Sequence, residues 1–177
     1  MTKTAVAPAN YTGLVLAVHP TQRGFGWVLF ENPASPVAWA IVHARAGRQE
    51  RLIASFRRLL RHYEPSILVL EAFDHGESRR SGHVRAFCRA MLREAERVHI
   101  ERRVFERDNV RSAFARFGAM TRSEIAQVIA QRVDSFAHRL PPSRRVWNAQ
   151  DTRQSLFDAA ALAITYFVAM GDESWPN

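Results

Sequence analysis

The chain has 177 residues, 47% of them hydrophobic, which suits one globular domain with enough chain to bury a full core. Its formal net charge is +8, with Lys3 the only lysine among 25 basic residues; this favours an acidic macromolecular partner such as nucleic acid, although a codon bias toward arginine would give the same excess. Cys88 is the only cysteine, which excludes an internal disulfide framework, and no apolar run reaches the roughly 18 residues of a membrane span or the pattern of a signal peptide, so we expect a cytoplasmic, nucleoid-associated protein.

The first predicted element is a β-hairpin in the stretch GLVLAVHPTQRGFGWVLFE, residues 13–31. Two apolar runs of strand length, residues 14–18 and 25–30, are joined by a short polar turn. Gly24 and Gly26 open the second run instead of a helix, which excludes the glycine-rich turn of a dinucleotide-binding fold. A buried first strand that continues into a hairpin is typical of the start of the ribonuclease H-like fold.

The rest of the chain alternates strands and helices behind a flexible lead of residues 1–12. Apolar runs predict three further strands, at residues 37–43, 66–71 and 103–106. Apolar spacing, capping residues and breakers predict helices at residues 47–63, 84–98, 121–136 and 153–170, with a helical turn over 108–115 capped by Asp108. We therefore predict one α/β domain over residues 13–172 with a ribonuclease H-like fold, a central mixed five-stranded sheet flanked by helices.

Two carboxylates and an imidazole are the candidate functional groups. Glu71 ends the central strand, Asp158 is the single charge within the apolar last helix, and His19 follows the first strand. A carboxylate in an apolar helix is costly unless it is paired, hydrogen-bonded or bound to a metal, and two converging carboxylates repel unless a cation lies between them. Mg²⁺ or Mn²⁺ would suit these oxygen ligands. A surface ion pair for Glu71, and a buried hydrogen bond to a helix N-terminus or an arginine for Asp158, are the alternatives.

Four stretches of the chain, in order, resemble the RuvC-type Holliday junction resolvases. They are GLVLAVHPTQRGFGWVLFE, SILVLEAF, DNVRSAFARFGAMTRSEIAQVI and DAAALAITYF, and the resemblance covers about residues 13–170. It implies a homodimer that acts in DNA recombination and repair by Mg²⁺-dependent nicking of Holliday junctions or other branched DNA, a hydrolysis of phosphodiester bonds.

The resemblance also implies roles for individual residues. Glu71 and Asp158 match metal-binding acids of the family. Arg111 and Arg122 match basic residues near the scissile phosphate, and Phe73 lies close to the place of an aromatic that inserts at the junction. An ordinary apolar loop residue for Phe73, and a solvated helix face for the arginines, are the alternatives. The basic residues expected to contact DNA are Arg79, Arg80, Arg111 and Arg122.

Two departures from the family leave the activity open. His19 stands where the family has the aspartate that bridges two metals, and Ser155 and Ala161 are the candidate positions for a second ligand of the last helix. Imidazole is a poor ligand for Mg²⁺ but a good one for Mn²⁺ or Zn²⁺, so His19 either keeps an altered metal site with Glu71 and Asp158 or is an inert, hydrogen-bonded replacement. The chain is then either a metal-dependent endonuclease, or a catalytically inactive nucleic-acid-binding protein or subunit of a larger nucleic-acid-processing complex.

Overall fold

A mixed five-stranded sheet with strand order β3-β2-β1-β4-β5 forms the centre of the protein. β1 (Val15–Thr21), β2 (Gly24–Asn32) and β3 (Ser35–His43) make an antiparallel meander, and β4 (Ile67–Glu71) and β5 (Glu101–Phe105) continue the sheet parallel to β1. The computed structural model describes residues 13–44, 49–74, 81–141, 152–172 and 175, so the predicted lead of residues 1–12 lies outside it. The predicted mixed sheet is confirmed.

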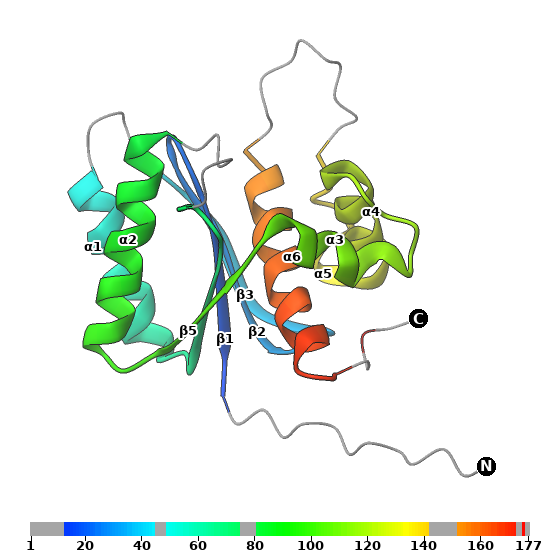
Figure 1. Ribbon diagram of the computed structural model, residues 1–177, viewed down its shortest axis with the longest axis horizontal. Coiled ribbons are helices and arrows are strands. Elements are labelled where there is room, and N and C mark those ends of the chain that lie inside the picture. The colour runs from blue at the N-terminus through cyan, green and yellow to red at the C-terminus, as the bar shows by residue number, and fades with distance from the viewer. Residues whose placement is uncertain (1–12, 45–48, 75–80, 142–151, 173–174, 176–177) are drawn as a thin grey trace.

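Helices cover the sheet on both faces (Figure 1). α1 (Gln49–Tyr63) and α2 (Gly82–Arg97) lie on one face, and α6 (Gln154–Ala169) lies along the other. Three shorter helices, α3 (Arg107–Ala115), α4 (Arg122–Arg132) and α5 (Asp134–Ala137), surround α6. None of the described helices combines the length and the apolar character that crossing a bilayer requires.

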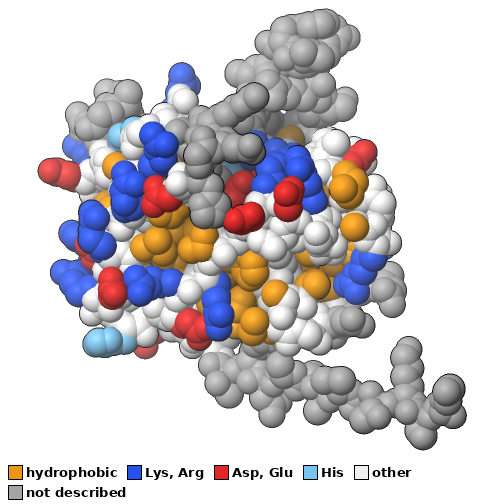
Figure 2. Space-filling model, in the orientation of Figure 1, with side chains coloured by type: hydrophobic (Ala, Val, Ile, Leu, Met, Phe, Trp, Pro, Cys, Tyr) orange, Lys and Arg blue, Asp and Glu red, His pale blue; other side chains and the backbone are white. Residues whose placement is uncertain are grey.

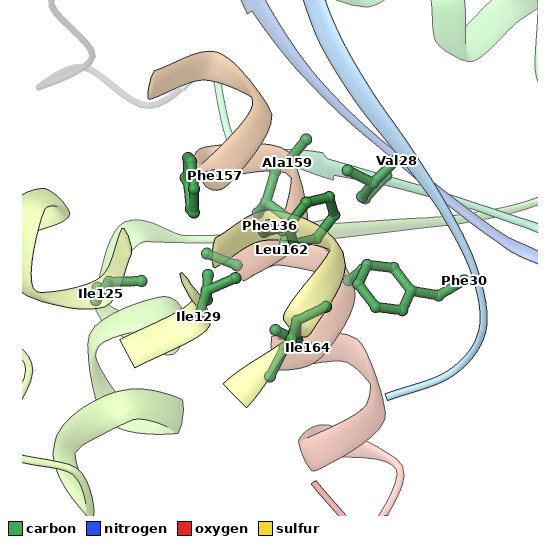
Figure 3. Packing of buried hydrophobic residues seen from close by; sticks show 14 of the residues in the cluster. Val28, Phe30, Ile125, Ile129, Phe136, Phe157, Ala159, Leu162 and Ile164 are labelled. Atoms are coloured by element: carbon green, nitrogen blue, oxygen red, sulfur yellow. The ribbon is translucent and has the colours of Figure 1, made fainter. Parts of the chain in front are cut away.

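The central strands contribute side chains to two separate hydrophobic cores, one on each face of the sheet. Leu16 and Val18 of β1 point to the cluster beneath α1 and α2, where Cys88 is fully buried. Val15 and Ala17, on the opposite face of the same strand, join the cluster around α6. Figure 3 shows this second cluster, with Val28 and Phe30 of β2 near Phe157, Ala159, Leu162 and Ile164 of α6, Ile125 and Ile129 of α4, and Phe136 of α5. Burial on both faces explains why residues 15–18 of β1 and 67–70 of β4 are all apolar.

Two of the predicted helix ends were wrong. The helix expected over residues 121–136 is two helices, because Val133 leaves helical geometry with φ −121° and ψ 96°. Asp108 does not cap α3; the N-cap is Glu106, whose backbone N–H donates a hydrogen bond to Asn109 Oδ1 at 2.8 Å. The second error concerns which polar residue satisfies the helix end, and several neighbouring residues here have side chains capable of it.

Gly26 allows α6 to lie close against β2. A Cβ added at Gly26 would lie 2.5 Å from the backbone carbon and oxygen of Ser155, in the first turn of α6, so no side chain fits unless that helix moves. We expect Gly26→Ala to lower the free energy of unfolding by about 1–3 kcal/mol, measured by urea denaturation. Gly82→Ala is the control, because a Cβ there meets no atom within 4 Å. A Gly26→Ala protein as stable as this control would show that α6 adjusts without cost.

Candidate functional site

The candidate site lies where the carboxyl ends of β1 and β4 meet the start of α6. The parallel register of these strands pairs Ala17 with Val69, and the same offset aligns His19 with Glu71. Asp158 enters from the second turn of α6, the helix whose first turn lies against Gly26, and His19 pairs with Gly26 across β1 and β2. The structure thus brings together the three residues that the sequence singled out.

The imidazole of His19 lies between the two carboxylates. Its Nδ1 is 3.5 Å from Glu71 Oε2, and its Nε2 is 3.5 Å from Asp158 Oδ2. The residue is buried, with 6% of its surface exposed. Because its two nitrogens face different carboxylates, the ring separates Glu71 from Asp158. The imidazole and the two carboxylates therefore do not point to one common position.

Arg122 forms a bidentate ion pair with Asp158. Its Nε donates to Asp158 Oδ1 at 3.0 Å, and its Nη2 donates to Asp158 Oδ2. The same Nη2 lies 3.2 Å from His19 Nε2, and Gln154 Nε2 donates to Asp158 Oδ1 at 3.2 Å. The buried bond to an arginine, one of the two alternatives for Asp158, is the arrangement that the structure shows.

A capping box at the start of α4 sets the position of Arg122. Thr121 Oγ1 accepts a hydrogen bond from the Glu124 backbone N–H at 3.3 Å, and Glu124 Oε2 accepts from the Thr121 N–H at 2.8 Å. Backbone donors of Thr121 and Met120 lower the pKa of Glu124. This capping box makes Arg122 the first helical residue of α4. The side chain of Arg122 is only 33% exposed, so the solvated helix face considered for it is wrong.

Burial and ion pairing act in opposite directions on the charges of this pair. Burial alone would raise the pKa of Asp158, but electrostatic interactions with His19 and Arg122 and the hydrogen bonds from Arg122 and Gln154 outweigh it and lower that pKa. Burial alone would lower the pKa of Arg122, but Asp158 and Glu71 outweigh it and raise that pKa. Asp158 and Arg122 are therefore both charged at neutral pH.

Arg107 is a further residue of this site, and the sequence analysis missed it. It is the first residue of α3, and it lines one pocket together with Glu71, Arg122 and Asp158. Its side chain is half-buried, and burial followed by the repulsion of Arg122 lowers its pKa. Nothing in the sequence distinguishes it from the many other arginines; only the position of α3 beyond the end of β5 brings it here.

The other residues that were expected to contact DNA do not lie together. Arg111 lines the same pocket, and its Nη1 donates to Asp108 Oδ1 at 2.9 Å. Phe73 is 5% exposed and packs in the cluster beneath α1 and α2, so it would have to leave that cluster to contact DNA. Arg79 and Arg80 lie outside the described residues.

The site in this conformation does not fit the expected metal centre. Among the described residues, no group of three or more His, Cys, Asp or Glu side chains is placed to hold a metal ion. Both oxygens of Asp158 are engaged by Arg122, and His19 separates the carboxylates. Of the two positions considered for a further ligand, Ala161 lines the pocket with a methyl group, and Ser155 donates its hydroxyl to a backbone carbonyl at 2.7 Å.

Comparison with solved structures identifies the fold. The chain is similar to RuvC of Thermus thermophilus, both free and in complex with a Holliday junction substrate, with a TM-score of 0.66 and 19% identity over 90% of this chain and 97% of that one. It is also similar to the yeast mitochondrial Holliday junction resolvase Ydc2, with a TM-score of 0.61 and 11% identity over 89% of this chain and 79% of that one. No family model and no curated protein matches the sequence. The chain has the RuvC-like resolvase fold of the ribonuclease H-like class that its motifs predict.

Proposed function

We propose that this chain binds branched DNA and that an internal ion pair keeps its RuvC-like site from metal-dependent cleavage. The bidentate contact of Arg122 with Asp158, beside a histidine that lies between two carboxylates, is the observation that carries the proposal. Two converging carboxylates need a cation between them. In this site the protein supplies that positive charge from its own side chains.

The surface charge supports a nucleic-acid partner. The chain carries a net charge of +8, and Figure 2 shows a group of basic side chains beside acidic side chains in the upper middle of the view. Arginines that neutralise DNA phosphates release counterions, which gives affinity without sequence preference. The similar fold of a RuvC solved with a Holliday junction substrate makes a four-way junction the substrate to test first.

The test measures binding and cleavage of a labelled four-way junction in parallel. We expect the wild-type chain to bind the junction in EDTA, with an affinity that falls at least about tenfold between about 50 and 200 mM salt. With Mg²⁺ or Mn²⁺ we expect no nicks, from the wild type or from Glu71→Gln. Absence of binding at low salt would remove the proposal, and paired nicks that disappear in Glu71→Gln would establish a nuclease instead.

Cleavage as a metal-dependent endonuclease is the second candidate function. The guanidinium of Arg122 is partly exposed, so a DNA phosphate could draw it away from Asp158 and free both carboxylates. Arg122 would then stabilise the negative charge that develops on the phosphorane. The junction assay decides between the non-cleaving DNA-binding protein and the endonuclease. Competition of RNA with the labelled junction tests whether the chain prefers RNA to DNA. The homodimer stays a prediction, which sedimentation of the purified chain tests.

A further inference from the structure

Arg107 is a half-buried cation without an acidic partner of its own. Of the three arginines that line its pocket, Arg122 pairs with Asp158 and Arg111 pairs with Asp108. Within the part of the chain that the structure describes, Arg107 has neither a hydrogen bond nor an ion pair. Its guanidinium nitrogens are not buried, and Glu71 and Asp158 act on them only through longer-range electrostatics. An anionic ligand at this pocket would therefore meet N–H donors that no described protein group occupies.

The depth of the charged groups favours an anion over a cation. The side chains of Glu71 and Asp158 are 14% and 11% exposed, whereas that of Arg122 is 33% exposed and Arg107 is half-buried. The cavity itself is about 20 Å³, enough for roughly one water molecule, so a phosphate would lie at its mouth, where the guanidinium groups are more exposed than the carboxylates. The same two guanidinium groups repel each other, and Arg122 contributes to the lowered pKa of Arg107. A negative charge between them would relieve this repulsion.

We infer that Arg107 and Arg122 together bind one phosphate group of the DNA backbone beside Glu71, an inference that rests on the proposed function. A planar guanidinium matches the oxygens of a phosphate in a bidentate arrangement, which an ammonium group does not. The rest of the pocket is apolar, being lined by Val110, Ile125, Ala161 and Leu162, so the charged contacts form where little water competes. The arginines supply the positive charge for this contact, so it does not require a divalent ion.

The first test compares Arg107→Ala with Arg58→Ala by measuring junction affinity against salt in EDTA. Arg58 is an exposed arginine of α1, on the opposite face of the sheet. Its replacement by alanine therefore removes the same charge far from the pocket. We expect Arg107→Ala to weaken binding about tenfold at low salt and to reduce the salt slope by about one phosphate contact, with little change in Arg58→Ala. Arg107→Lys should keep the slope and recover only part of the affinity. An Arg107→Ala protein that binds like Arg58→Ala would overturn the inference.

The second test uses inorganic phosphate and therefore does not depend on DNA binding. Phosphate should raise the unfolding temperature of the wild type above that in chloride of equal ionic strength; Arg107→Ala should lose most of this gain, and Arg107→Lys should keep part of it. Phosphate protection through Arg107 in a protein that fails to bind junctions would contradict the proposed function and leave the phosphate site standing. Junction binding that is indifferent to Arg107, with no phosphate protection, would contradict the site alone.

Discussion

Asp158→Asn should lower the free energy of unfolding at pH 7 by about 3 kcal/mol. Removal of one partner from a buried ion pair typically costs about 3–5 kcal/mol, because the other charge stays buried without compensation. We expect the lower end of this range, since the side chain of Arg122 is one-third exposed and water can solvate part of its charge. Urea denaturation of the wild type and the variant at pH 7 measures the difference.

The effect of this substitution should shrink in acid. The pKa of Asp158 is lowered in the folded chain, so its contribution to stability is complete above the ordinary aspartate pKa of about 4 and disappears as the pH falls through the lowered value. Wild type and Asp158→Asn should therefore converge in stability at low pH. Asp74→Asn is a matched control on the surface, where the side chains of Asp74 and its partner Arg89 are 56% and 49% exposed, and it should cost much less. A difference that grows in acid would show that the stabilisation does not come from the charged carboxylate.

A double-mutant cycle would isolate the pair. Arg122→Gln alone leaves Asp158 buried beside Glu71 with less positive charge, so it should also destabilise the chain. Asp158→Asn combined with Arg122→Gln should cost less than the sum of the two single changes, because neither charge is then left alone. Strict additivity would mean that the two side chains stabilise the fold independently.

The sequence predicts those residues of the site whose positions follow from the backbone of their strand or helix. The backbone fixes the position of a carboxylate at the end of a parallel strand and of one inside a buried helix. This is why the convergence of Glu71 and Asp158 with His19 could be anticipated. The partner of Asp158 could not be singled out. Arg122 is 36 residues away, and its reach depends on how α4 packs against α6.

Residues whose role depends on tertiary packing were the ones that the sequence left undecided. Gly26 excluded a dinucleotide-binding turn, but the close approach of α6 that requires a glycine there involves a helix more than a hundred residues away. Phe73 follows a strand and could have pointed either to solvent or to the core, and the position of α2 decided for the core. Arg107 became distinctive only because α3 begins at the pocket.

Replacement of His19 and Ala161 by aspartate should give the chain a response to Mg²⁺ that the wild type lacks. The double variant would place carboxylates at the two positions that a histidine and a methyl group now occupy in the site. In EDTA, repulsion among the carboxylates should make it less stable than the wild type. Mg²⁺ at ten times its dissociation constant should restore about 1.4 kcal/mol, or roughly 3–5 °C in unfolding temperature. Thermal unfolding with and without Mg²⁺ measures this, and the junction assay shows whether nicking appears.

The controls separate the effect of the two carboxylates from that of the ion pair. His19→Asn with Ala161→Ser has polar groups at both positions but no new charge, and it should stay indifferent to Mg²⁺. A double aspartate variant that is not stabilised by Mg²⁺ would mean that Arg122 blocks the site whatever surrounds it. Arg122→Gln added to that variant should then produce the stabilisation by Mg²⁺. If Mg²⁺ stabilises the wild type itself, Arg122 must already leave Asp158 at little cost. The cleaving enzyme, and not the closed DNA-binding protein, would then be the better description of this chain.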